Sequence, residues 1–298
     1  MTRKLLMIAF AAFALAASGC GSSSSSSGST PSSSTAADPC AVGSLKTLTA
    51  GTLTIGTDNP AYSPYFTGGS GHEWKGQYNN DPYTGKGFED AVAYAVAEKM
   101  GFTQPQVKWA VTHFNQAYQP GPKNFDFYLA QVCYSAHRAT AVDFSDSYYD
   151  VNQSVVALKS NPIAKTTSLA DLKQYKLGTQ IGTTSYDYIT KTIQPSRQPQ
   201  AYTTLNDAIH ALQAKQIDGI VIDLPTAFYM TAVQIPDSTV VGQFPAVTGG
   251  EHYGLVLEKG SSLTPCVSKA LAALKADGTL TALTKTWLSD KVSAPILQ

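Results

Sequence analysis

The chain of 298 residues lacks several features that nucleic-acid-binding and metal-binding proteins need. Its 21 basic and 21 acidic residues cancel, so no basic excess is available to hold a nucleic acid or an anionic membrane. Four cysteines without a C-x₂-C pair and five scattered histidines do not fit a zinc site. No window after the N-terminal region has the roughly 18 uninterrupted apolar residues of a transmembrane helix. We therefore expect no nucleic acid partner, no metal and no cofactor.

The first twenty residues have the pattern of an export signal. Two basic residues precede an apolar stretch, 5–17, that is shorter than the roughly 20 residues needed to span a bilayer. The stretch leads into Ala17-Ser18-Gly19-Cys20, which resembles a bacterial lipobox with alanine where leucine is usual. We expect 1–20 to be a lipoprotein signal peptide and Cys20 to become the lipidated N-terminus. An ordinary signal peptide that is cut elsewhere is the alternative.

Serine dominates the next segment, 21–39, where apolar residues that could form a core are nearly absent. Ten of the fifteen residues in 21–35 are serine, so we expect a flexible tether to the membrane. The rest of the chain is long enough to form two lobes, each with a core of its own.

Strand-like and helix-like segments alternate along this remaining part. Polar and apolar residues alternate in 52–56, as in a strand, and 91–100 has its apolar residues on one helical face. A second set of such segments follows 151, including an apolar strand, 217–223, that ends in Asp223. Strands that alternate with helices over this length predict an α/β fold.

One segment, 124–149, carries most of the functional information, and its sequence is NFDFYLAQVCYSAHRATAVDFSDSYY. It has a single arginine, Arg138, among small and hydroxyl residues after a strand-like apolar run. A guanidinium is a rigid fork of donors that fits a carboxylate face to face. On the arginine alone, a surface ion pair with Asp143 or Asp146 is the simpler interpretation.

The whole segment resembles the extracellular solute-binding proteins of family 3, which serve polar amino acid ABC transporters. That family has a Ser-x-Thr-x-x-Arg signature and then Val-Asp-Phe-Ser-x-x-Tyr. The chain reads Cys133-Tyr134-Ser135-Ala136-His137-Arg138 and then VDFSDSY. The resemblance implies a two-lobed, periplasmic-binding-protein-like (type II) α/β fold with two crossover strands. It implies a first lobe from 40–150 and 247–298, and a second lobe from 151–246.

The resemblance also gives the ends of an amino acid their partners. Arg138 would bind the α-carboxylate, and Asp223 would hold the α-ammonium from the other lobe. Thr183 and Thr184 open a helix in the second lobe, where free N–H groups and the helix dipole attract an anion. Simple helix capping is the alternative for Thr183, and likewise for Asp223.

Five further residues would surround the ligand's side chain or shape its pocket. Tyr62 and Phe88 would enclose the side chain, unless they only pack in the core or on the surface. Asp58 would accept a hydrogen bond from a polar or cationic side chain, or merely hold its own turn. Cys133 replaces the usual serine or threonine, so its backbone N–H should contribute more than its weakly donating thiol. Gln131 stands where small residues are common.

The cysteines permit one disulfide bond in an exported protein. With Cys20 lipidated, three cysteines remain. Cys40 precedes the first expected strand and Cys266 begins a late expected helix, so we pair these two as a link between the ends of the folded chain. Cys133, inside the ligand segment, should be a free, buried thiol.

These patterns predict a monomeric lipoprotein on the outer face of the bacterial cell membrane. It would capture a polar amino acid between closing lobes and deliver it to an ABC transporter permease. One alternative is an enzyme on the same fold, like cyclohexadienyl dehydratases or a lytic transglycosylase, with Glu89 or Asp58 as acid or base. Another is a sensory lipoprotein. The pair of Arg138 and Asp223 favours binding, and neither a G-x-S-x-G nor an H-E-x-x-H pattern is present.

Overall fold

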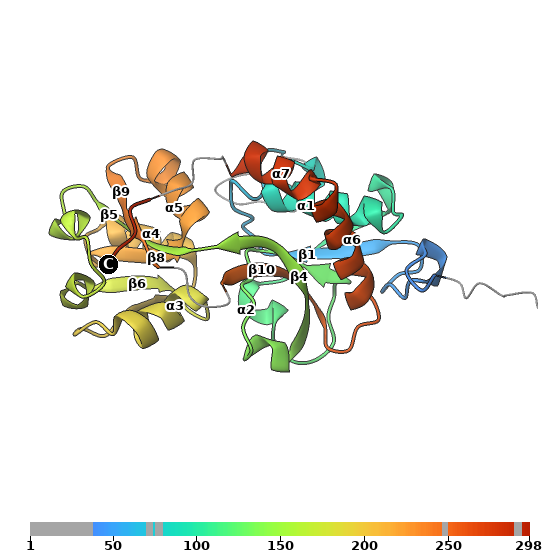
Figure 1. The fold of residues 1–298 in the computed structure, drawn as a ribbon, viewed down its shortest axis with the longest axis horizontal. Coiled ribbons are helices and arrows are strands. Elements are labelled where there is room, and N and C mark those ends of the chain that lie inside the picture. The colour runs from blue at the N-terminus through green and yellow to red at the C-terminus, as the bar shows by residue number, and fades with distance from the viewer. Residues whose placement is uncertain (1–37, 70–73, 75–79, 246–249, 289–293) are drawn as a thin grey trace, which may run out of the picture. The chain divides into compact units, whose positions relative to one another are not determined.

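The structure is a computed structural model that describes residues 38–69, 74, 80–245, 250–288 and 294–298 (Figure 1). The expected signal peptide, the lipidation at Cys20 and all but the end of the expected tether lie outside these residues. The described residues all belong to one compact unit. None of the described helices is long and apolar enough to cross a membrane.

Two mixed sheets of five strands each form the framework of two lobes. In the first sheet, the order is β2-β1-β3-β10-β4, with β1 parallel to β2 and β3, and β10 antiparallel to β3 and β4. Its strands are β1 (Leu53–Thr57), β2 (Val107–Val111), β3 (Phe127–Tyr128), β4 (Val142–Val151) and β10 (Glu251–Glu258).

The second sheet has the order β7-β6-β8-β5-β9, with β6 parallel to β7 and β8, and β5 antiparallel to β8 and β9. Its strands are β5 (Gln153–Leu158), β6 (Leu177–Gln180), β7 (Gln200–Tyr202), β8 (Gly219–Asp223) and β9 (Ser238–Gln243). The two sheets with their helices confirm the expected two-lobed α/β fold.

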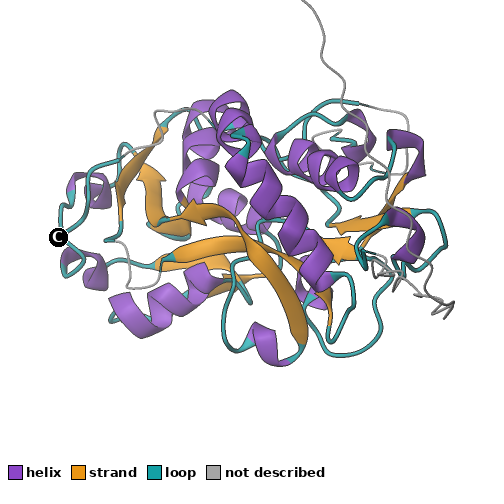
Figure 2. Ribbon diagram, turned by 45° about the vertical axis from the view of Figure 1, so that its right-hand side comes forward, coloured by secondary structure: helices purple, strands orange, loops and turns teal. Residues whose placement is uncertain are grey.

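Helices pack around both sheets, as the second view shows in purple and orange (Figure 2). In the first lobe they are α1 (Phe88–Lys99), α2 (Phe114–Ala117), α6 (Thr264–Ala276) and α7 (Thr279–Trp287). In the second lobe they are α3 (Thr184–Tyr188), α4 (Leu205–Gln213) and α5 (Leu224–Tyr229). Two of these continue as single π-helical stretches, α3 into Ile189–Ile193 and α5 into Met230–Gln234.

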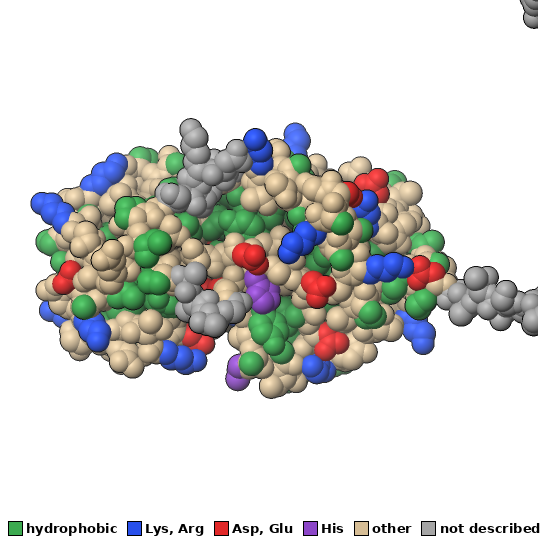
Figure 3. Space-filling model, in the orientation of Figure 1, with side chains coloured by type: hydrophobic (Ala, Val, Ile, Leu, Met, Phe, Trp, Pro, Cys, Tyr) green, Lys and Arg blue, Asp and Glu red, His purple; other side chains and the backbone are tan. Residues whose placement is uncertain are grey.

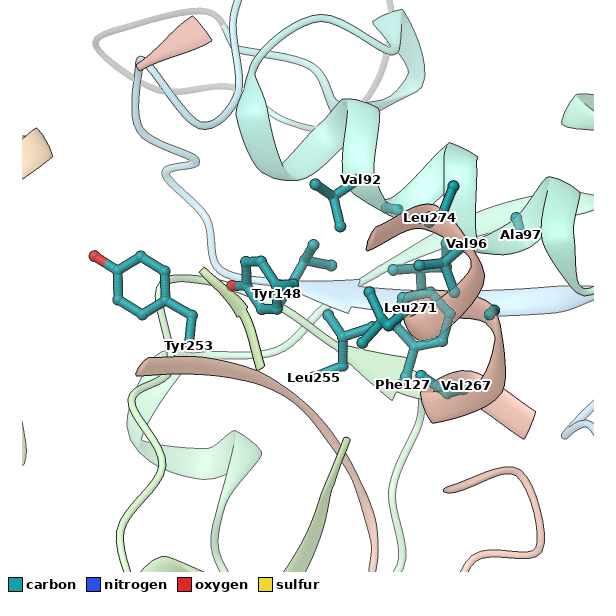
Figure 4. Packing of buried hydrophobic residues seen from close by; sticks show 14 of the residues in the cluster. Val92, Val96, Ala97, Phe127, Tyr148, Tyr253, Leu255, Val267, Leu271 and Leu274 are labelled. Atoms are coloured by element: carbon teal, nitrogen blue, oxygen red, sulfur yellow. The ribbon is translucent and has the colours of Figure 1, made fainter. Parts of the chain in front are cut away.

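The core of the first lobe lies between α1, α6 and the sheet. Figure 4 shows Val92 and Val96 of α1 and Leu271 of α6 close to Phe127 of β3 and Leu255 of β10. These side chains are almost completely shielded from water, and burial of this kind is the main favourable term in folding. The core therefore fixes β3, which leads directly into the segment that carries Arg138.

The start of α1 depends on a glycine. The helix begins at Phe88, earlier than the expected 91–100, and Gly87 before it has a φ of 112°. A Cβ at position 87 would lie 2.3 Å from the carbonyl oxygen of Tyr65. Only glycine can take this backbone conformation at such a close approach. This turn aims the first residue of α1 into the core.

The chain passes between the lobes where β4 ends and β5 begins, at Asn152. It returns between β9 and β10, and residues 246–249 of that return lie outside the described part. The end of the chain corrects one expectation, because 294–298 pack on the second lobe and not on the first. Ile296 forms a β-bridge with Gln243, and Leu297 is buried in a second-lobe core cluster. The other expected lobe boundaries stay predictions.

The expected disulfide is present between Cys40 and Cys266, and Cys133 is free and buried. The Cys40–Cys266 bond joins the segment before β1 to the first turn of α6, across a sequence separation of 226 residues. A cross-link over so long a loop removes much of the conformational entropy of the unfolded chain.

We predict that replacing Cys40 and Cys266 together by alanine lowers the free energy of unfolding by about 2–5 kcal/mol. Urea denaturation of the wild type and the double variant measures this difference. The wild type unfolded with a reductant present is the control, and it should match the double variant. Equal midpoints for the oxidised wild type and the double variant would contradict the prediction.

Candidate functional site

A cleft lined by both lobes contains about 710 Å³ of empty space, its open mouth included. Eight of the nine expected ligand contacts line it: Asp58, Tyr62, Gln131, Cys133, Arg138, Thr183, Thr184 and Asp223. The structure thus brings residues from four separate segments together in one cavity. Their contact with a ligand stays a prediction.

Phe88 is the exception, and the expectation that its ring covers the ligand is wrong in this structure. Its side chain is 0% exposed, and its ring packs edge-on against Tyr149 with 5.4 Å between centroids. The turn at Gly87 directs it into the core of the first lobe. A different aromatic residue, Phe66, forms part of the cleft wall.

Arg138 lies in the cleft and is only 5% exposed. Its Nη1 donates to the carbonyl of Cys133 at 2.6 Å, and its Nη2 donates to the carbonyl of Gly182 at 2.7 Å. Its guanidinium also stands over the rings of Tyr118, at 4.5 Å, and Phe114, at 5.4 Å. These two carbonyls accept from two of the five N–H donors of the guanidinium, and the Tyr118 side chain also interacts with it.

The surface-pair interpretation of Arg138 is wrong in this structure. Asp143 instead forms an ion pair with Lys259, at 3.2 Å, and Asp146 is exposed. Within the described ranges, no carboxylate forms an ion pair with Arg138. A buried cation without an acidic partner is costly unless dipoles or a bound anion compensate it. The cleft therefore has a fixed positive charge that is available to an anionic ligand group.

Asp223 supplies negative charge from the other lobe. It ends β8 and is 8% exposed, and its carboxylate accepts hydrogen bonds from Gln153 Nε2 and, at 2.7 Å, from the Tyr253 hydroxyl. It precedes α5 but its side chain makes no capping hydrogen bond, so the capping alternative is not what the structure has. Burial raises the pKa of this carboxyl, and the negative charge of Glu251 raises it further. A ligand cation beside it would stabilise the charged form.

The two threonines at the start of α3 have different roles. The Thr183 hydroxyl accepts from the backbone N–H of Tyr186 at 3.1 Å and donates to the Gln180 carbonyl at 2.7 Å, which is helix capping. Thr184 begins the helix and lines the cleft together with Cys133. Burial raises the pKa of the Cys133 thiol well above its usual range, so this thiol is uncharged.

Asp58 follows β1 at the other end of the cleft lining. Its carboxylate accepts from the backbone N–H of Asn59 at 2.7 Å and of Phe114 at 3.2 Å, and it lies 3.2 Å from His113 Nδ1. The residue therefore holds its own turn and also faces the cleft, so both expected roles are compatible with its position. The contact with His113 has no signal in the sequence, because 55 residues separate the pair.

Gln131 depends on a buried carboxylate that sequence patterns did not link to it. Its backbone has a φ of 52°, and its N–H donates to Glu89 Oε1 at 2.7 Å. Its side-chain amide and the Tyr148 hydroxyl donate to the same carboxylate. Burial raises the pKa of Glu89 to about 7, although these three hydrogen bonds each lower it. Glu89 is not among the residues that line the cleft, so it is poorly placed to act as an enzyme's acid or base.

Comparison with known proteins identifies the family. Residues 73–290 match the model described as "Bacterial extracellular solute-binding proteins, family 3". The chain belongs to this family. Family members are extracellular or periplasmic, and the match confirms the resemblance that the segment around Arg138 indicated.

Curated relatives in the family have names of amino acid-binding proteins. A probable histidine-binding protein of Campylobacter jejuni is 27% identical over 231 residues, covering 76% of this chain and 81% of its own. An arginine-binding extracellular protein of Bacillus subtilis is 26% identical, covering 68% and 78%. An L-cystine-binding protein of Escherichia coli is 25% identical, covering 83% and 86%.

Solved structures of the same fold include two ancestral proteins. An ancestral arginine-binding protein bound to arginine has a TM-score of 0.64 and 28% identity, covering 80% of this chain and 98% of its own. An ancestral amino acid-binding protein described as a precursor of cyclohexadienyl dehydratase also has a TM-score of 0.64, with 26% identity, covering 80% and 95%. The fold therefore occurs in binding proteins and in the ancestry of an enzyme.

Glu89 gives a testable pH dependence. Its pKa is raised from 4.5 to about 7 in the folded state. The protonated carboxyl therefore stabilises the folded protein fully below the unfolded-state pKa of 4.5, and this stabilisation is lost as the pH rises through about 7. Glu89→Gln removes this titration. From about pH 5 to about pH 8, the free energy of unfolding of the variant should therefore gain about 2–3 kcal/mol relative to wild type.

Urea denaturation of both proteins across this pH range measures the change. Glu98→Gln is the control, since Glu98 lies exposed in the same helix. A constant difference between Glu89→Gln and wild type at all pH values would show the prediction to be wrong.

Proposed function

We propose that the cleft binds one polar amino acid as a zwitterion. The supporting observation is a buried arginine without an acidic partner on the first lobe, opposite a buried aspartate on the second. The N–H donors of Arg138 that do not bond to the two carbonyls suit an α-carboxylate, and Asp223 suits an α-ammonium. Charge-assisted hydrogen bonds of this kind are about twice as strong as neutral ones.

The remaining part of the cleft would receive the side chain. Asp58, Tyr62 and Gln131 also line the cleft and offer a carboxylate, an aromatic ring and an amide. Such a lining favours a polar side chain over an aliphatic one, because polar groups that lose water without gaining a new hydrogen bond are costly to bury. The names of the relatives, which bind histidine, arginine or cystine, point to the same class of ligand.

The proposal extends to capture, anchoring and delivery. The amino acid first contacts Arg138 on the first lobe, and closure then adds Thr184 and Asp223 from the second. The ligand shifts the equilibrium between open and closed forms by its differential affinity for them. We further propose that lipidated Cys20 anchors the monomer to the outer face of the membrane, where it hands the amino acid to an ABC transporter permease. The expected export signal and serine-rich tether support this arrangement.

A thermal-shift screen against the twenty standard amino acids tests the proposed function. A ligand that binds only the folded state raises the melting temperature, and we expect the largest increases with polar or cationic amino acids. Calorimetry then gives the affinity of the best ligand. No increase with any of the twenty would refute the proposal.

Arg138 is the residue on which binding should depend most. Arg138→Ala should weaken binding of the amino acid chosen by the screen at least about 30-fold, because truncating one partner of a buried charge pair costs about 2–5 kcal/mol. Arg197→Ala, which removes an exposed arginine of the second lobe, is the control and should bind normally. Circular dichroism verifies that both variants fold. Unchanged affinity in a folded Arg138→Ala variant would contradict the assignment.

A further inference from the structure

Three side chains of the first lobe meet one glycine of the second lobe. The carbonyl of Gly182, in the turn between β6 and α3, accepts from Arg138 Nη2 at 2.7 Å. The Tyr118 hydroxyl lies 3.1 Å from the same oxygen and 2.6 Å from Asn115 Oδ1. The ring of Tyr118 also lies under the guanidinium of Arg138, 4.5 Å from it. This group is called the Gly182 contact below.

The contact requires that residue 182 have no side chain. A Cβ there would lie 2.5 Å from Asn115 Oδ1 and 2.6 Å from the Tyr118 hydroxyl oxygen. Real Cβ atoms essentially never come within 3.0 Å of such atoms, so the ends of the Asn115 and Tyr118 side chains would have to move away. Gly182 also has a φ of 78°, which glycine adopts at no steric cost.

We propose that Gly182 is a positioning residue that completes the fixation of Arg138 when the lobes close, and that its missing side chain leaves room for Asn115 and Tyr118 beside its carbonyl. The inference deepens the proposed function and rests on it. In the first lobe alone, the guanidinium is held by the Cys133 carbonyl on one nitrogen and by aromatic rings. The second nitrogen acquires its carbonyl partner only from the other lobe.

The consequence concerns the carboxylate end of the ligand. A bidentate hydrogen bond between guanidinium and carboxylate depends on the orientation of the planar fork. Gly182 sets this orientation without touching the ligand's side chain. Loss of the contact should therefore reduce the preference for a free α-carboxylate. It should lower the affinity for ligands that have this carboxylate more than the affinity for ligands that lack it.

The experiment compares Gly182→Ala with Gly260→Ala. Gly260 has nearly the same backbone conformation, with a φ of 77°, but a Cβ there would meet nothing within 4 Å. Both variants thus carry similar backbone strain, and only the first displaces the side chains of the Gly182 contact. Calorimetry measures their affinities for the amino acid chosen by the screen and for its α-amide, which lacks the carboxylate charge.

We expect Gly182→Ala to lose about tenfold or more in affinity for the amino acid, and clearly less for the amide. Gly260→Ala should match wild type with both ligands. Equal affinities in the two variants, or equal losses for amino acid and amide, would overturn the inference.

A second variant keeps the inference testable if Gly182→Ala does not fold. Tyr118→Phe removes the hydroxyl but keeps the ring beside Arg138, and it should also reduce the ratio of amino acid to amide affinity. An unchanged ratio in that variant would count against the Gly182 contact. Failure of the proposed function is distinct, because the wild type itself would then bind none of the twenty amino acids.

Discussion

The burial of one uncompensated guanidinium governs the rest of the site. Arg138 is removed from water, yet within the described ranges it has no acidic partner and is held by two carbonyls and two rings. Dipoles and π-faces offset part of the desolvation cost of a cation, but they do not neutralise it. An anion in the cleft would supply the negative charge that compensates the guanidinium. The site is therefore complementary to a carboxylate. The carbonyls and rings around Arg138 hold its guanidinium in position to bind one.

The cleft also keeps its two opposite charges apart. In the described part of the chain Arg138 and Asp223 form no ion pair, although they line the same cavity. Asp223 is instead held by Gln153 and Tyr253, as Arg138 is held by backbone carbonyls. Because each charged side chain is held by its own hydrogen bonds, the two do not move together into an ion pair, and the space between them stays open. By contrast, charges on the face in Figure 3 are interspersed, with no large patch of one sign to attract a polyanion.

Short-range patterns predicted the α/β elements, and the family resemblance supplied the eight expected residues that line the cleft, while contacts set by distant parts of the chain were missed. Phe88 fits a family motif, but its direction is decided by Gly87 against the carbonyl of Tyr65. The tail at 294–298 joins the second lobe by pairing with Gln243, a contact that no local periodicity encodes. Glu89 supports Gln131 across 42 residues, so neither residue alone indicates the pair.

Hydrogen bonds between the lobes occur beside both Asp223 and Arg138. They reduce the free energy that a ligand has to contribute to closure. At the Asp223 end, Tyr253 of β10 donates to the carboxylate at 2.7 Å, and Tyr65 lies 3.0 Å from the Thr226 hydroxyl. At the other end, Gly182 supplies the acceptor for Arg138. A ligand needs to provide only the remaining difference in free energy between open and closed forms. Because the protein's own contacts stand beside the proposed carboxylate and ammonium positions, an amino acid that lacks either group would leave one end of the closed cleft without its charge partner.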